Sequence, residues 1–228
     1  MEQKEKNLEL DRLVFFSDAI VAIAITLLAL DLRAVKSGSE LTYADIFHSW
    51  HKFAAFFLSF IIIAMFWKIH HQFYFYIKKI DEKLLLFNVF WLFLITLIPF
   101  TTNLLSDNLT NIPAVSVYCA NIFMLSFAQN LIWDYACDKV IFFPGTKAMI
   151  SGETLLKEDV LQSTIREYRL ACNIAMVNSF IALIFSFFLP VLAIILLFSR
   201  ILFFRRAAVQ WMNKSMERRN KRRNRNKS

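Results

Sequence analysis

One acidic residue lies well inside an apolar stretch of this sequence. Asp18 falls within the apolar run 13–32. A carboxylate in such a setting needs a paired cation, hydrogen-bond donors or water. On a helix that advances about 100° per residue, Asp18 points away from the apolar stripe that the same helix carries. We therefore expect Asp18, and Ser17 beside it, to contact neighbouring helices.

Two adjacent histidines, His70 and His71, follow the apolar run 53–67. Three roles are open to them: metal ligands, pH sensors or hydrogen-bonded structural residues. Neighbouring side chains on a helix diverge by about 100°, and no Cys or carboxylate cluster completes a ligand set, so we expect no metal site. The structural role is favoured, with one imidazole bonded to Asp18 or Arg12.

The apolar stripe of the run 13–32 has helical spacing. Its members share one face: Arg12, Phe16, Ala19, Ile23, Leu27 and Leu30. Taken alone, the spacing is typical of ordinary helix packing.

The amino-acid composition indicates whether the chain is surrounded by water or by lipid. Of 228 residues, 57% are hydrophobic and 19% are charged, with a net charge of +8. Such a chain is too apolar for an ordinary soluble domain, and disorder or nucleic-acid coating fits poorly. Cys119, Cys137 and Cys172 follow no ligand spacing, which argues against a disulfide framework or a zinc site. The composition favours a protein embedded in a lipid bilayer.

The elements that must position these residues are membrane-spanning helices. A hydrocarbon core about 30 Å thick needs roughly 20 apolar residues per helix. The run 170–204 is too long for one span, and Pro190 is suited to open a second helix within it. The sequence therefore predicts an all-α membrane protein, with a segment 1–12, a six-helix domain 13–206 and a basic tail 207–228. The expected helices are 13–32, 52–75, 84–105, 113–134, 169–186 and 189–206.

The distribution of basic residues indicates the orientation. The flanks 1–12, 68–83, 134–169 and 200–228 hold 23 of the 26 Lys and Arg residues. Because basic loops stay in the cytoplasm, six spans with both termini cytoplasmic in the cell membrane is the consistent topology. The tail 207–228 is either a disordered segment that fixes this topology or a contact for anionic lipids.

The absence of known motifs argues against several classes of protein. The chain has no Gly-rich phosphate loop, GxSxG, HExxH or CxxC, so we expect neither an enzyme nor a bound cofactor. The potassium-channel loop Thr-Val-Gly-Tyr-Gly and the spaced arginines of a voltage sensor are also missing.

A family resemblance emerges from the first helix. Residues 12–18 read Arg-Leu-Val-Phe-Phe-Ser-Asp, which resembles the R-x-x-x-F-S-D signature of the transmembrane protein 175 family of potassium channels. The similarity continues through Thr26, Leu30, the Phe-Trp-x-x-His-His pattern at 66–71, and Asn88 followed by Leu-Ile-Pro-Phe at 97–100.

This resemblance implies a potassium leak channel without a re-entrant filter loop, in which the first helix lines a central pore of a homotetramer. It implies that Ile23, Leu27 and Leu30 form stacked apolar rings at the constriction. The resemblance also implies a network that holds this helix at its angle, with the members Arg12, Phe16, Ser17, Asp18, Trp67, His70, His71 and Asn88.

Rings of aliphatic side chains leave a narrow neck from which water withdraws readily, so small helix shifts can wet or dry it. The rings offer no oxygen to replace a hydration shell, so we expect only a modest preference for potassium over sodium. Thr26 lies at the edge of the stripe, where its hydroxyl either contacts a hydrated ion or bonds to a carbonyl one turn back.

Two other classes stay open. A proton-coupled secondary transporter would use Asp18 as its titrating carboxylate and a histidine as a relay. A membrane scaffold would transport nothing and use its basic tail on lipid or a partner. Passive currents far above a carrier's rate would distinguish a channel from both.

Overall fold

The computed structural model describes residues 2–30, 32, 42–137, 155–156 and 162–199. Its elements in these ranges are helical apart from one isolated β-bridge between Ile77 and Leu156. The expected basic tail 207–228 and the end of the expected sixth helix lie outside the described residues.

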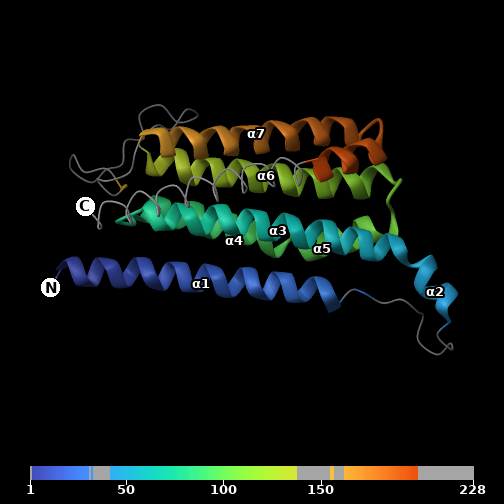
Figure 1. Ribbon diagram of the computed structural model, residues 1–228, viewed down its shortest axis with the longest axis horizontal. Helices are drawn as coiled ribbons and strands as arrows, with labels where there is room; N and C mark the ends of the chain where they lie inside the picture. Colours follow the sequence, from blue (N-terminus) through green and yellow to red (C-terminus); the bar gives the residue numbers. More distant parts are fainter. Residues whose placement is uncertain (1, 31, 33–41, 138–154, 157–161, 200–228) are drawn as a thin grey trace, which may run out of the picture.

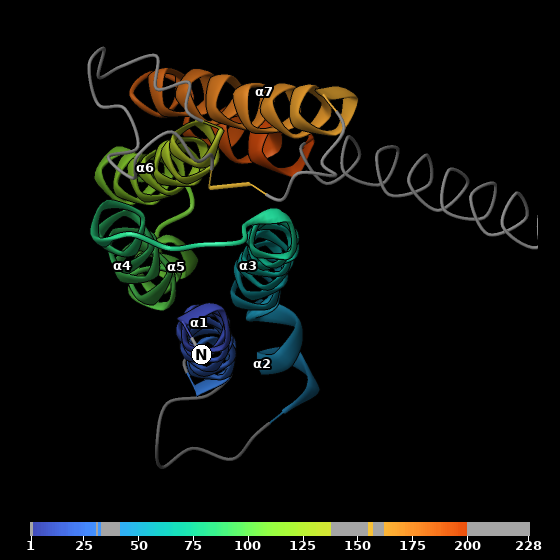
Figure 2. The ribbon, with the colours of Figure 1, turned by 90° about the vertical axis from the view of Figure 1, so that its left-hand side faces the viewer.

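The helices form three layers (Figures 1 and 2). The long helix α1 occupies one edge, and α3, α4 and α5 form the middle layer against which it packs. The pair α6 and α7 covers the other side of this layer. The bounds are Glu2–Leu30 for α1, Tyr43–His48 for α2, Trp50–Tyr76 for α3, Glu82–Thr96 for α4, Ile98–Asp107 for α5, Ile112–Ala136 for α6 and Gln162–Ser186 for α7.

Five stretches of the described chain are long and apolar enough to cross a membrane. These are Leu8–Leu30, Trp50–Tyr76, Glu82–Asp107, Ile112–Ala136 and Ser163–Ser186. A shorter apolar helix, Pro190–Ser199, follows the turn after α7. Its ten described residues are too few for a span, which needs roughly 20.

The third span differs from the continuous helix expected at 84–105, because it is divided at Leu97 into α4 and α5. Pro99 lies in the first turn of α5 and has no N–H to continue the helical ladder. Buried hydrogen bonds connect the divided span to α3 and α6. Thr102 Oγ1 of α5 donates to Ser59 Oγ of α3 at 2.7 Å. Ser59 Oγ in turn lies 2.9 Å from the Tyr118 hydroxyl of α6.

Local sequence explains several helix starts. Asp81 caps α4, since its Oδ1 accepts a hydrogen bond from Leu84 N at 2.8 Å. Asn111 caps α6 in the same way, and Pro113 in the first turn suits a helix start.

Candidate functional site

The helix α1 has two faces that differ in burial. The inner face packs on the middle layer, and its members are at most 7% exposed: Leu13, Ser17, Val21, Ala24 and Leu28. The outer face carries the stripe expected from the sequence, with Ile23 58%, Leu27 40% and Leu30 69% exposed. This apolar stripe therefore lies on the open edge of the bundle and not in the core of the single chain.

Thr26 lies beside this stripe and is exposed. Its Oγ1 donates to Ile23 O at 2.8 Å, so the in-helix hydrogen bond considered above is present. After donating this bond, the hydroxyl oxygen still has two lone pairs that can accept hydrogen bonds.

A buried chain of hydrogen bonds joins α1 to α4 and α3. His70 Nε2 lies 2.7 Å from Asn88 Oδ1, Asn88 Nδ2 donates to Ser17 Oγ at 3.0 Å, and Ser17 donates to the carbonyl of Leu13 at 2.8 Å. All three polar side chains are at most 1% exposed. Because an amide oxygen only accepts, His70 must carry its hydrogen on Nε2. The ring of His70 stacks on Trp91 at a centroid distance of 4.1 Å, which fixes its plane.

Asp18 makes the second link between α1 and α3. Its Oδ1 accepts a hydrogen bond from the indole Nε1 of Trp67 at 2.8 Å. His71 Nδ1 lies 3.9 Å from Asp18 Oδ2, which is an ion-pair distance when the imidazole is protonated and too long for a hydrogen bond. The side chains of Asp18 and His71 are 33% and 53% exposed.

These contacts correct part of the expected network. The hydrogen-bond donor to Asp18 is the Trp67 indole and not an imidazole, because His70 lies on the face of α3 that meets Asn88. In the described chain, no hydrogen bond or ion pair joins Arg12 to these residues, and both Arg12 and Phe16 are exposed. Within the described ranges no group of three or more His, Cys, Asp or Glu side chains is placed to hold a metal ion.

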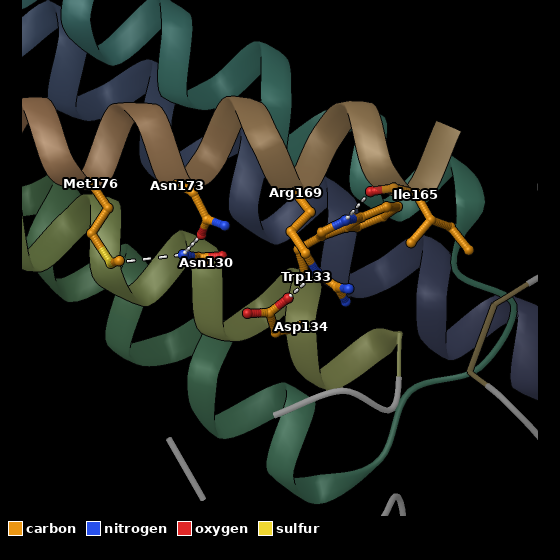
Figure 3. A network of polar contacts seen from close by, with 7 residues as sticks. All are labelled: Asn130, Trp133, Asp134, Ile165, Arg169, Asn173 and Met176. Atoms are coloured by element: carbon orange, nitrogen blue, oxygen red, sulfur yellow. Dashed lines mark hydrogen bonds and ion pairs between the residues drawn. The ribbon is translucent and has the colours of Figure 1, made fainter. Parts of the chain in front are cut away.

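A second polar region, which was not predicted from the sequence, lies between α6 and α7 (Figure 3). Arg169 Nε donates to Asp134 Oδ1 at 2.8 Å, with the Asp134 side chain only 5% exposed. Asn130 donates to Asn173 Oδ1 at 2.7 Å one turn further along. Asp134 directly follows one apolar run and Arg169 directly precedes the next. An acidic residue at the end of one span and a basic residue at the start of the next could have predicted this ion pair from the sequence.

Together these features define a multi-pass helical membrane protein whose first helix is tied by polar side chains to the next two spans and keeps an apolar face open. Known proteins place the chain within this class. The family described as "Endosomal/lysosomal potassium channel TMEM175" matches residues 12–99. A potassium channel of Chamaesiphon minutus is 30% identical over 142 residues, which cover 60% of this chain and 70% of that channel. The chain belongs to the TMEM175 family.

Other relatives differ in length and in the ion that their names give. A potassium channel of Streptomyces collinus is 31% identical over 133 residues, which cover 55% of this chain and 63% of that protein. The zebrafish protein named "Endosomal/lysosomal proton channel TMEM175" is 27% identical over 187 residues, which cover 81% of this chain and 36% of the zebrafish protein. The chain thus matches less than two thirds of either relative.

The fold also matches a solved structure. The crystal structure of a lysosomal potassium-selective channel TMEM175 homologue from Chamaesiphon minutus superimposes with a TM-score of 0.71. The match covers 86% of this chain and 96% of that one at 23% sequence identity, so it establishes a shared fold.

Proposed function

We propose that this chain forms a leak-type ion channel that conducts potassium with a modest preference over sodium, through a pore lined by α1. The observation that carries the proposal is the outer face of α1, where Ile23, Leu27 and Leu30 are exposed although the opposite face of the same helix is buried. The names of the bacterial relatives, which are potassium channels, support the choice of ion.

One apolar stripe cannot enclose a pore, so the proposal requires several copies around an axis, and we propose four. Asp18 gives separate support for a neighbouring copy or water beside α1. A carboxylate facing lipid near the middle of a helix costs about 3 kcal/mol or more, and the Asp18 side chain is 33% exposed. A neighbouring copy or a water-filled space beside α1 removes this cost.

The rings of Ile23, Leu27 and Leu30 form the constriction in this proposal. Four branched aliphatic side chains at each level make a neck that water leaves readily, and small shifts of α1 wet or dry it. Potassium is favoured because it sheds hydration water at a lower cost than sodium. The Thr26 hydroxyl oxygen lies at the edge of the neck, where it accepts hydrogen bonds from the water around a hydrated ion.

The network of Ser17, Asp18, Trp67, His70 and Asn88 holds α1 at a fixed angle in this mechanism, while His71 supplies a nearby second partner for Asp18. We assign Arg12 and Phe16, which are exposed in the single chain, to contacts between copies near the start of the pore.

The proposed orientation has both termini in the cytoplasm. The start of α1, the turn between α3 and α4, and the start of α7 lie at one end of the bundle (Figure 1). Lys78, Lys79, Lys83 and Arg166 lie near this end, whereas Lys52 lies near the other. Basic residues stay on the cytoplasmic side. The short helix Pro190–Ser199 is then the start of a sixth span, and the basic tail 207–228 lies near anionic lipid headgroups.

The reversal potential of the purified protein tests this function. The full-length chain is reconstituted in a planar bilayer with potassium on one side and sodium on the other. Channel-sized currents that reverse toward the potassium equilibrium potential are expected. If the protein instead carries no current and drives proton-coupled uptake into liposomes, the channel is rejected and Asp18 becomes the titrating group of a carrier.

A further inference from the structure

Two side chains from the α6–α7 pair contact α3 immediately before and after the segment that holds the pore helix. Gln129 of α6 donates from Nε2 to the carbonyl oxygen of Phe66 at 3.2 Å. The hydroxyl of Tyr168 on α7 donates to Gln72 Oε1 at 2.5 Å. Phe66 directly precedes Trp67, and Gln72 directly follows His71. The contacts therefore enclose residues 67–71, a segment that includes Trp67, His70 and His71 of the network.

The spacing of these contacts restrains α3 in two ways. Phe66 and Gln72 are six positions apart, which is about 9 Å along a helix axis. A single contact would leave α3 free to rotate about it, whereas contacts on two different turns oppose both rotation and sliding. Gln129 is 2% exposed, so water does not compete for its hydrogen bond.

The α6–α7 pair that carries these side chains is itself joined by buried polar contacts. Asp134 pairs with Arg169, Asn130 bonds to Asn173, and Ser126 lies 2.9 Å from Ser179 (Figure 3 shows the first two). Packing and interhelical hydrogen bonds drive helix association in lipid, where the hydrophobic effect between helices is missing. These contacts hold α6 and α7 together. Gln129 and Tyr168 therefore keep a fixed position relative to each other.

Further contacts connect α6 to α3 and to the start of α4. The rings of Phe73 and Trp133 stack at a centroid distance of 4.5 Å. The Tyr135 hydroxyl donates to Asp81 Oδ2 at 2.5 Å, and Asp81 is the N-cap of α4, two helical turns before Asn88. Both helices that bond to α1 are thus held from the opposite side by α6 and α7.

We propose that Gln129 and Tyr168 are positioning residues of the pore, which set the register of Trp67 and His71 against Asp18. The inference rests on the proposed channel function for its electrical readout, but the geometry of the Asp18–Trp67 contact can be followed without any current. The two side chains contact neither α1 nor its outer face in this assignment, and they act only through α3.

The test uses Gln129→Leu and Tyr168→Phe, singly and together, in the full-length protein. Each substitution removes the hydrogen bonding of that side chain to α3 and keeps most of the side-chain bulk, so the fold is expected to survive. A thermal unfolding scan verifies this. The matched control is Tyr43→Phe, which removes the hydroxyl of a tyrosine that is 85% exposed on α2. In single-channel records we expect open probability to change about threefold to tenfold, as expected for one lost hydrogen bond, with unitary conductance and reversal potential unchanged.

A double-mutant cycle with Trp67→Phe separates positioning from a general loss of stability. Because Gln129 and Tyr168 act through Trp67 in this inference, their effects on open probability should largely vanish in the Trp67→Phe background. Fully additive effects would overturn it, as would variants that match the Tyr43→Phe control.

The indole N–H resonances of 15N-labelled protein provide a readout that needs no current. The Trp67 resonance is assigned by its loss in Trp67→Phe, and its position reports the hydrogen bond to Asp18. We expect this resonance to shift in both variants while that of Trp50, at the other end of α3, stays in place. An unmoved Trp67 resonance rejects the positioning role, whereas a shifted resonance in a protein without current rejects only the channel.

Discussion

The polar side chains around α1 form a hydrogen-bond chain with a defined direction. His70 donates to Asn88, Asn88 donates to Ser17, and Ser17 donates to the carbonyl of Leu13. The three side chains are buried away from water, and each donates a hydrogen bond to the next group in the chain. An unpaired polar group costs more there than in water, so the chain defines one position of α1 against α3 and α4.

Replacing Asn88 by Ala should destabilise the fold strongly for a single substitution. It leaves His70 and Ser17 buried without this partner, and the expected loss is about 1–3 kcal/mol in the free energy of unfolding. Thermal or denaturant unfolding of the purified protein measures it. Asn103→Ala, at a partly exposed site on α5, should change stability by less than about 0.5 kcal/mol. Equal effects at the two sites would argue against the hydrogen-bond chain.

Replacing Asp18 by Asn tests the second link. The Asn oxygen can still accept the Trp67 indole hydrogen bond, but the negative charge beside His71 is lost. We expect a change in tetramer yield or open probability and an unchanged reversal potential, because the charge holds the helix and does not face the stripe. An intact tetramer with altered ion preference would contradict this assignment.

At the scale of elements, α1 combines an anchored face with an open one. Its inner face contributes Val21, Ala24 and Leu28 to the core, and its outer face keeps Ile23, Leu27 and Leu30 exposed. A lipid-facing helix also exposes apolar residues. In the proposed channel this outer face meets other copies around water.

Replacing Leu27 by Asn should raise the unitary conductance, because an amide in the central ring lowers the cost of keeping water in the neck. Single-channel recording in symmetrical potassium measures the change. Leu170→Asn is the matched control, since Leu170 is 62% exposed on α7, away from α1. If both variants conduct like the parent protein, Leu27 does not belong to the constriction.

At the scale of the whole molecule, the three layers separate two tasks. The α6–α7 pair lies on one side of the middle layer, and α1 lies on the other side, at the edge of the bundle (Figure 2). An edge helix packs on its neighbours on one side only, so a small shift of α1 disturbs fewer contacts than a shift of a helix in the middle layer. This is the property that a gate built on α1 requires.

The proposed pore requires an assembly of four copies. In mild detergent or nanodiscs, native mass spectrometry should find four protomers of 26.8 kDa each. In a closed ring the same contact is repeated between every pair of neighbouring protomers. Such a ring is complete, and no protomer is left with an uncovered interface. A monomer or dimer that still conducts potassium would refute the four-fold pore.

Much of the membrane architecture could be predicted from the sequence. Hydropathy sums over about 20 neighbouring residues, so it locates the apolar spans and the turn before Pro190 without any knowledge of packing. The division of the third span at Leu97 was not predicted, although Pro99 was visible, because proline in a span bends, breaks or is tolerated according to its neighbours.

The sequence alone also determined that Asp18 needs a partner and that Ile23, Leu27 and Leu30 share a face, since both follow from local composition and helical periodicity. Only the tertiary structure decided which partners Asp18 has, because the rotation of α3 brings Trp67 to hydrogen-bond distance and His71 to ion-pair distance, and turns His70 toward Asn88. The Asp134–Arg169 pair and the contacts of Gln129 and Tyr168 were likewise decided by packing. They join residues 35 to 96 positions apart, and no periodicity within one segment specifies how two helices face each other.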